Sequence, residues 1–261
     1  MIKDYEDFKE AILKLSSVDL NAYKERQMKR RIDSLIRKNN AKDYEAFVAL
    51  LKNDKKIYEE FINYLTINVS EFYRNPAQWK VLEENILPYL FDTFSNNLKI
   101  WSAACSTGDE PYSLAMVLSK FIPLSKIKII ATDIDKQVLD KARVGLYNEK
   151  SIAGLPSEFK DKFFKKNGNS YQIVDEIKKC IEFKHMNLLK DQYPTNCDLI
   201  VCRNVLIYFT DEAKNNIYKK FNKSLKKGGI LFVGSTEQII QSSQYQITPV
   251  KSFFYKKDGE L

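Results

Sequence analysis

Acidic residues follow two apolar runs of this chain, at points where a strand would end and a binding site could form. Asp109 and Glu110 lie in the segment 99–112, KIWSAACSTGDEPY, and Asp133 ends the run IIATD, 25 residues after Gly108. Carboxylates in such a loop would repel a pyrophosphate but attract an ammonium group. An acid about 20 residues beyond a loop of this kind commonly accepts hydrogen bonds from ribose hydroxyls. These residues therefore predict a site for a ribose-bearing, positively charged ligand.

Gly108 is the single glycine of this loop, so the G-x-G-x-x-G cradle of a dinucleotide is absent. S-adenosylmethionine carries both an ammonium group and a ribose, so it fits better than NAD. Two other interpretations stay open on these segments alone. Asp109 and Glu110 also favour the start of a helix at Pro111, and an acid placed like Asp133 also occurs in NAD sites.

Two further segments place polar side chains beside apolar ones. These side chains are Asn68, Ser70 and Arg74 in NVSEFYRN, and Arg203, Asn204 and Tyr208 in DLIVCRNVLIYF. The second segment begins as a buried strand, and polar groups just past its end would face the same cleft as the acids. Arg74 could hold a carboxylate through two parallel hydrogen bonds, or it could form a salt bridge between domains.

Methyl transfer from a sulfonium is an in-line displacement, for which a protein supplies orientation and excludes water. An amine or hydroxyl acceptor often needs a base, whereas a glutamate carboxylate, with a pKa of ~4.3, is already ionised at neutral pH. The chain has one histidine, His185, which we expect to be structural. It lacks both the paired-proline motif of DNA amino-group methylation and the Pro-Cys of cytosine carbon methylation. A carboxylate acceptor is therefore favoured by exclusion.

The elements that must position these residues fall into two kinds. Residues 1–70 contain no Gly or Pro and repeat apolar residues at helical spacing, which predicts an N-terminal helical domain. Residues 71–96 are expected to be a linker. Over 97–261, strand-like apolar runs alternate with amphipathic helices, the pattern of an α/β domain with a doubly wound, mostly parallel sheet. Such a sheet would bring the acids to its carboxyl edge.

Two stretches depart from this alternation. Residues 155–183, with Gly168-Asn169 at a turn, predict a small β-hairpin insertion. The C-terminal YQITPVKSFFYKK predicts two short strands around Thr248-Pro249. They would form an antiparallel hairpin at the end of the domain.

Residues 24–38, KERQMKRRIDSLIRK, predict an amphipathic helix with one apolar and one basic face. The basic side chains that we consider for docking are Arg26, Arg30, Arg31 and Arg37. Such a face suits an acidic helix of a partner, although a solvated face and RNA binding also fit the pattern.

Composition narrows the class of protein further. No apolar run reaches the about 18 residues of a membrane span, and the first residues lack an apolar signal core. We therefore expect a cytoplasmic protein without membrane insertion. The net charge of +8 suits an acidic partner. The four cysteines are widely spaced, which predicts reduced, mostly buried thiols and no metal site.

In this order and spacing, NVSEFYRN, WSAACSTGDEPYSLA, ATDID, NLL and CRNVLIYF closely resemble the CheR family of chemotaxis receptor methyltransferases, along nearly the whole chain. The resemblance implies a Rossmann-like, seven-stranded methyltransferase sheet with an inserted β-subdomain, joined to an all-helical, substrate-docking N-terminal domain. It implies methyl transfer from S-adenosyl-L-methionine to glutamate side chains of methyl-accepting chemotaxis receptors, without a metal. The products would be glutamate 5-O-methyl ester and S-adenosyl-L-homocysteine.

The same resemblance implies roles for particular residues. The implied cofactor contacts are Asn68, Ser70, Arg74, Glu110, Asp133, Asn187, Leu188, Arg203 and Asn204. Arg74 and Tyr208 would position the target glutamate and the methyl group. The sequence departs from the family where Asp109 replaces a more usual Glu and where Ser70 stands in place of a frequent Thr.

The implied partner is the cytoplasmic helical region of the receptors, met by the four arginines of residues 24–38. We expect a monomer that binds no nucleic acid and is recruited to membrane receptor arrays. Two alternatives remain: a non-catalytic S-adenosylmethionine-binding signalling module, and an RNA methyltransferase.

Overall fold

The structure of the protein, a computed structural model, describes residues 2–261 and divides into two compact units. The first contains the chain up to Asn68 together with Tyr208–Asn215, and the second contains Val69–Ile207 and Asn216–Leu261. The segment that begins at Tyr208 therefore belongs to the N-terminal unit, although it lies far along the chain.

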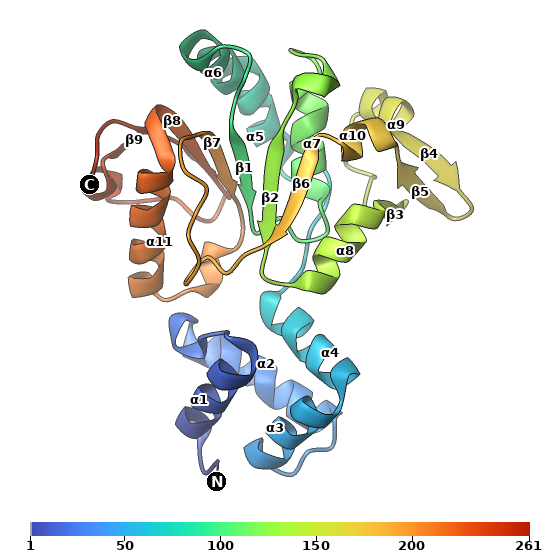
Figure 1. The fold of residues 1–261 in the computed structure, drawn as a ribbon, viewed down its shortest axis with the longest axis vertical. Helices are drawn as coiled ribbons and strands as arrows, with labels where there is room; N and C mark the ends of the chain where they lie inside the picture. The colour runs from blue at the N-terminus through green and yellow to red at the C-terminus, as the bar shows by residue number, and fades with distance from the viewer. Residues whose placement is uncertain (1) are drawn as a thin grey trace. The chain divides into compact units, whose positions relative to one another are not determined.

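The first unit is helical, as residues 1–70 predict. Its elements are α1 (Tyr5–Ser16), the 3-10 turn η1 (Leu20–Ala22), α2 (Glu25–Lys38), α3 (Tyr44–Asn53) and α4 (Lys55–Thr66), which Figure 1 shows in blue and cyan. The side chains of Asp4, Asp43 and Asp54 accept backbone N–H groups of the following turn at 2.8–3.0 Å. These caps satisfy donors that the first turn of a helix leaves free, so α1, α3 and α4 each begin directly after one of these residues.

Aromatic side chains form the core of this unit. Phe8, Phe47 and Phe61 are fully buried. The ring centroid of Phe47 lies 6.4 Å from that of Phe8 and 5.8 Å from that of Phe61. Helices α1, α3 and α4 thus share one apolar centre, which α2 joins through its buried Ile32.

Backbone hydrogen bonds hold the Tyr208 segment in the same unit. The Lys24 N–H donates to the Tyr208 carbonyl at 2.9 Å, and the Thr210 N–H donates to the Ala22 carbonyl at 2.8 Å. Tyr208 is therefore fixed beside the first residues of the basic helix α2.

The second unit contains a seven-stranded sheet with the order β6-β2-β1-β7-β8-β10-β9. Its strands are β1 (Ile100–Ala103), β2 (Ile129–Asp133), β6 (Ile181–His185), β7 (Cys197–Cys202), β8 (Leu225–Val233), β9 (Ile247–Lys251) and β10 (Phe254–Lys257). Neighbouring strands are parallel except where β10 pairs with β8 and with β9. The seven-stranded, mostly parallel sheet is therefore confirmed.

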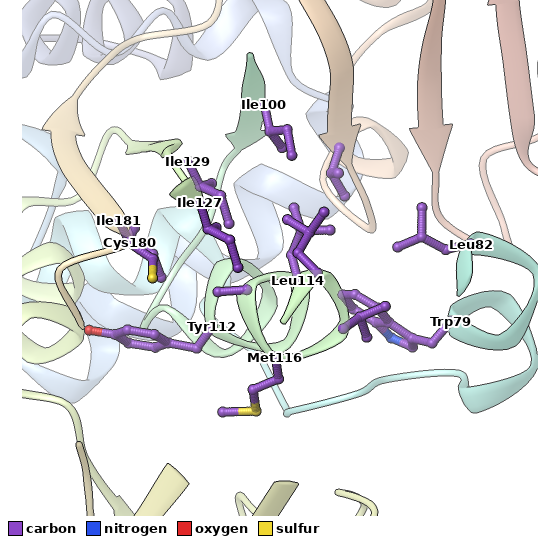
Figure 2. Packing of buried hydrophobic residues seen from close by; sticks show 14 of the residues in the cluster. Trp79, Leu82, Ile100, Tyr112, Leu114, Met116, Ile127, Ile129, Cys180 and Ile181 are labelled. Carbon is purple, nitrogen blue, oxygen red and sulfur yellow. The ribbon is translucent and has the colours of Figure 1, made fainter. Parts of the chain in front are cut away.

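Helices cover both faces of this sheet, because its central strands are buried on both sides. These helices include α5 (Pro76–Val81), the π-helical turn η2 (Leu82–Ile86), α6 (Leu87–Phe94), α7 (Asp109–Leu118), α8 (Lys136–Val144) and α11 (Asp211–Ser224). On one face, Ile100 and Ile129 point toward Leu114 of α7 (Figure 2). On the other, the Trp101 ring lies 5.6 Å from that of Phe221 in α11.

The structure corrects the expectation of a linker over 71–96. Most of that stretch is helical, in α5, η2 and α6, and it belongs to the second unit. Trp79, Leu82 and Leu90 are fully buried in the core around α7. Helical spacing of these large apolar side chains explains the difference, since their burial stabilises helices that the local sequence signals only weakly.

A separate three-stranded antiparallel sheet, β3-β5-β4, follows α8. Its elements are β3 (Leu146–Asn148), α9 (Ser157–Phe163), β4 (Phe164–Asn167) and β5 (Ser170–Ile173), followed by α10 (Asp175–Lys178). The hairpin around Gly168-Asn169 is present as β4 and β5. The bounds differ from the expected 155–183, because β3 pairs with β5 and residues 181–183 belong to β6 of the large sheet.

The C-terminal hairpin is also present, but its turn comes after the expected position. Thr248 and Pro249 lie within β9, and the turn falls at Ser252 and Phe253. Pro249 is tolerated because β9 is the edge strand of the sheet, where a missing N–H costs no ladder hydrogen bond.

The chain reverses its order across the sheet between β1 and β7. From β1 it continues outward to β2 and β6, and from β7 it continues the other way to β8. In open α/β sheets, ligands bind beyond the carboxyl ends of strands at such a switch point. The loops after Ala103 and Cys202 leave the sheet at this place.

Among residues 2–261, no helix has the length and apolar character that crossing a lipid bilayer requires.

Candidate active site

The loop after β1 folds tightly against the end of β2. Ala104, Ser106 and Gly108 all adopt left-handed backbone conformations. A Cβ atom on Gly108 would lie 2.9 Å from the Cβ of Ala142, so glycine is required there. The N–H of Cys105 donates to the Thr132 carbonyl at 2.9 Å. Left-handed non-glycine residues cost free energy and gather at functional sites, so this loop is a candidate ligand cradle.

Glu110 turns its side chain into the sheet and does not cap the helix that it begins. One carboxylate oxygen accepts a hydrogen bond from the Ser102 hydroxyl of β1 at 2.9 Å, and the other lies 3.6 Å from the Arg203 guanidinium. Burial raises the pKa of Glu110 to about 7, against the opposing effect of Arg203. A largely shielded carboxylate in this setting can pair with an ammonium group, which would restore its ionised form.

The carboxylate of Asp109 has different hydrogen-bond partners from that of Glu110. Its buried carboxylate accepts hydrogen bonds from the hydroxyls of Thr107 and Ser70. Burial raises the pKa of Asp109, and these hydrogen bonds oppose that shift. Asp109 therefore joins the loop after β1 to the segment that contains Ser70 and Arg74.

Asp133 ends β2 as the sequence predicts, with both carboxylate oxygens engaged by the backbone. One oxygen accepts the Ser106 N–H at 2.8 Å, and the other accepts the Asp135 N–H at 3.0 Å. Burial raises the pKa of Asp133 to about 6. A carboxylate has about four acceptor sites, so Asp133 keeps acceptor capacity for a hydroxyl group. Asp135 itself caps α8 by accepting the Gln137 N–H.

Arg203 leaves β7 and is almost fully buried. Its guanidinium lies 5.4 Å from the Trp79 ring centroid and 4.8 Å from that of Phe232. It donates to the Arg74 carbonyl and to the Gln78 side chain, both at 2.7 Å. Arg203 thereby ties the segment before α5 to the switch point of the sheet.

The 69–75 segment is held through its backbone. The Tyr73 N–H donates to the Ser113 hydroxyl of α7 at 3.0 Å, and the Trp79 ring N–H donates to the Arg74 carbonyl at 2.9 Å. Tyr73 and Asn75 are left-handed. The Arg74 side chain is partly exposed and donates to the Val69 carbonyl at 3.3 Å. Its position is set by its own backbone, so the guanidinium can be used for a ligand.

Asn187 and Leu188 follow β6, next to Asp133. The N–H of Met186 donates to the Asp133 carbonyl at 2.9 Å. The Asn187 side chain accepts the Leu189 N–H at 2.9 Å in a tight turn, and Leu188 is buried. These two residues therefore lie beside the carboxyl end of β2.

The second unit contains one group of the predicted site residues. They are Ser70, Arg74, Glu110, Asp133, Asn187, Leu188, Arg203 and Asn204. Asn68 and Tyr208 belong to the helical unit, where the Asn68 side chain donates to the Thr66 hydroxyl at 2.8 Å. The predicted docking arginines also lie in that unit, on α2.

The arginines of α2 differ from one another. Arg26, Arg30 and Arg37 are exposed. Arg31 is half-buried, donates to the Tyr64 carbonyl at the end of α4 and stacks on the Tyr64 ring at 4.1 Å. Arg31 therefore holds two helices of its own unit together.

Sequence reasoning missed several residues that shape the site. These are Ser102, Gln78, Trp79 and Glu237, each of which contacts a predicted residue or its loop. The partners of Gln78 and Glu237 are 125 and 33 residues away along the chain, so local pattern gives no signal for these two residues. Trp79 alone had a signal, as a large apolar residue at helical spacing.

Buried polar atoms left without a partner test whether a cofactor suits this place. Within the described chain, the Ser106 hydroxyl, the Arg203 Nε and the Gln78 amide nitrogen are buried without a hydrogen bond. Such groups are costly unless a ligand or water satisfies them. They surround the same loops as Glu110 and Asp133, so the residues present fit a polar cofactor. Residues 2–261 contain no group of three His, Cys, Asp or Glu side chains that could hold a metal ion.

The sheet order, the terminal antiparallel strands and the acids after β1 and β2 define the class of S-adenosylmethionine-dependent methyltransferases. Two family models match the chain: the CheR methyltransferase all-alpha domain over residues 3–66 and the CheR methyltransferase SAM-binding domain over residues 68–254. The chain therefore belongs to the CheR methyltransferase family.

Relatives with curated names are similar along most of their length. Proteins of Listeria innocua and Listeria monocytogenes, each named chemotaxis protein methyltransferase, are 42% identical over 98% of this chain and 97% of their own. A protein of the same name from Borreliella burgdorferi is 34% identical over 85% of this chain and 83% of its own.

Proposed function

We propose that this protein transfers a methyl group from S-adenosyl-L-methionine to glutamate side chains of methyl-accepting chemotaxis receptors. The products are glutamate 5-O-methyl ester and S-adenosyl-L-homocysteine. The receptor part of the proposal is supported by the relatives named chemotaxis protein methyltransferase, which match this chain almost end to end. The site is supported by one observation above all: Glu110 is a carboxylate only 13% exposed, at the switch point beside Arg203.

The cofactor, when bound, supplies a methyl group on a positively charged sulfur. Glu110 would hold the ammonium group of its methionine end, because a buried carboxylate gains from an opposite charge. Asp133 would accept hydrogen bonds from the ribose hydroxyls. Asn68, Ser70, Asn187, Leu188, Arg203 and Asn204 would complete the contacts.

Arg74 and Tyr208 are proposed to place the acceptor. The Arg74 guanidinium can hold one carboxylate oxygen of the target glutamate, which leaves the other free to attack. No base is needed, because a glutamate carboxyl with a pKa of ~4.3 is ionised at neutral pH. The residues therefore act by orientation and by excluding water, which suits an in-line displacement.

The helical domain is proposed to dock the receptor. Arg26, Arg30 and Arg37 give α2 an exposed basic face, which complements helices rich in glutamate. We further propose that the protein acts as a cytoplasmic monomer recruited to receptor arrays. The domain boundary near residue 70 would separate this docking function from the cofactor site.

The experiment is incubation with methyl-labelled S-adenosylmethionine and a receptor cytoplasmic fragment. We expect protein-bound label that mild base releases as methanol, because a carboxyl ester is base-labile. Base-stable label on RNA would instead identify an RNA methyltransferase. Cofactor binding without transfer to the fragment or to RNA would identify a non-catalytic binding module.

A further inference from the structure

A buried carboxylate with no assigned role holds the loop that follows β7. Glu237 is 5% exposed and accepts three backbone N–H groups. One oxygen accepts the Leu206 N–H at 2.7 Å, and the other accepts the N–H groups of Asn204 at 2.5 Å and Gly234 at 2.9 Å. Hydrogen bonds to an ionised acceptor are about twice as strong as neutral ones. Glu237 thus joins the loop after β7 to the loop after β8.

This loop lies beyond the end of strand β7, so its backbone N–H groups depend on the Glu237 carboxylate as their acceptor. Asn204 is left-handed, with a φ of 60°. A buried N–H that loses its acceptor costs free energy, and in this loop the acceptors of Asn204 and Leu206 are both on Glu237. A Cβ on Gly234 would lie 2.6 Å from a Glu237 oxygen and 2.8 Å from the Asn204 nitrogen, so only glycine permits this approach.

The same carboxylate acts on the charged pair of the site. Burial lowers the pKa of Arg203 and raises that of Glu110, and the negative charge of Glu237 opposes the first shift and adds to the second. Arg203 therefore has two acidic neighbours, Glu110 at 3.6 Å and Glu237 behind the adjoining peptide. Loss of Glu237 would change both the backbone position of residue 204 and the balance of charge around Arg203.

We propose that Glu237 is a positioning residue for the cofactor site: it holds the backbone of Asn204, and with it the Arg203 side chain, in the arrangement that binds S-adenosylmethionine. This proposal rests on the proposed function, and it adds a residue that makes no cofactor contact of its own. Glu237 acts through Asn204 and Arg203 and does not touch the reacting atoms.

The test compares Glu237→Gln with a matched control, Asp198→Asn. Asp198 is also a fully buried carboxylate at one end of β7, but it lies at the opposite end from Arg203. It accepts the Lys99 N–H at 2.7 Å and pairs with Lys226 at 2.8 Å. Both variants remove a buried charge beside β7, and only the first removes it at the switch-point end of that strand.

We expect Glu237→Gln to raise the dissociation constant of S-adenosylhomocysteine, measured by calorimetry, about tenfold, the scale of one lost charged hydrogen bond. The KM for S-adenosylmethionine should rise similarly, and the KM for the receptor fragment should stay within about twofold. Asp198→Asn should lower the thermal midpoint while leaving the dissociation constant within about twofold of wild type.

Gly234→Ala tests the same contact without removing the charge, since its new methyl group must displace the Glu237 carboxylate. It should weaken binding to a similar degree, and it serves if Glu237→Gln does not fold. Wild-type affinity in a folded Glu237→Gln or Gly234→Ala variant would overturn the proposal, as would equal weakening in Asp198→Asn. Absence of binding by the wild-type protein would instead refute the proposed function.

Discussion

The charged side chains at the end of β7 and those on helix α2 differ in how firmly the protein holds them. Arg203 is buried against two aromatic rings and donates to a backbone carbonyl and a side-chain amide. Arg30 on α2 is exposed. Buried charges act through fixed geometry and are little screened by salt, whereas exposed charges act through long-range attraction that salt weakens. We therefore expect the first region to decide chemistry and cofactor binding, and the second to decide partner affinity.

Arg74→Ala should have the largest effect, because it removes a guanidinium without touching the buried Arg203. Arg203 and Trp79 bind the carbonyl of Arg74, which the substitution keeps. Turnover with the receptor fragment should fall about 100-fold or more, the usual loss for one positioned charge-stabilising donor, while S-adenosylhomocysteine affinity changes little. Single-turnover label transfer and calorimetry measure the two quantities. Near-normal methylation would remove the Arg74 side chain from the mechanism.

Glu110→Gln should come next, because it removes the charge that pairs with the cofactor's ammonium group. We expect the dissociation constant of S-adenosylhomocysteine to rise about 10- to 100-fold, the range for a lost charge-assisted hydrogen bond. Glu182→Gln, in the exposed edge strand β6, is the control and should bind as wild type. Equal affinity in Glu110→Gln and wild type would place the ammonium group elsewhere.

The pH dependence of cofactor binding should follow Glu110. Since the pKa of Glu110 in the ligand-free protein is raised to about 7, a growing fraction is protonated as the pH falls below that value. The ammonium group needs the ionised form, so the dissociation constant of S-adenosylhomocysteine should rise about tenfold between pH 8 and pH 6.

Stability of the ligand-free protein should change in the opposite sense. A carboxyl whose pKa is raised by folding takes up its proton more readily in the folded state, so its contribution to stability falls as the pH rises from about 4.5 through 7. Glu110→Gln should remove this part of the pH dependence of the thermal midpoint.

For binding, a wild-type affinity for S-adenosylhomocysteine that does not change with pH would show that Glu110 is ionised throughout.

Arg30→Glu should have the smallest effect and should be confined to the partner. We expect the KM for the receptor fragment to rise about threefold to fivefold at low salt and the difference to shrink at high salt. S-adenosylhomocysteine affinity should not change. Arg31→Ala is a contrasting variant that should lower the thermal midpoint, because Arg31 holds the Tyr64 carbonyl. An unchanged KM for Arg30→Glu would mean that this face of α2 is only solvated.

Much of the fold could be predicted because it rests on local patterns. The alternation of apolar strands and amphipathic helices after residue 97 gave the doubly wound sheet, and the turn at Gly168-Asn169 gave a hairpin. The stretch 71–96 was misjudged because α5 and α6 form through burial of Trp79 and Leu90 against α7. Strand β3 was missed because three residues carry too little period to recognise.

The site was predictable only where chemistry and strand ends coincide. Glu110 lies in the helix that follows β1 and Asp133 ends β2, so their positions come from topology alone. Glu237 could not be found in this way, because its partner Asn204 is 33 residues away and the contact exists only once both loops are folded. The different partners of Asp109 and Glu110 could also not be predicted, since two neighbouring acids at a helix start look alike in sequence.

A crystal structure of the protein with S-adenosylhomocysteine would show where the cofactor binds. We expect the amino group of the ligand within hydrogen-bonding distance of Glu110 and both ribose hydroxyls on Asp133, at the carboxyl ends of β1 and β2. A ligand bound elsewhere, or its ammonium group turned away from Glu110 toward solvent, would show that Glu110 does not hold the cofactor.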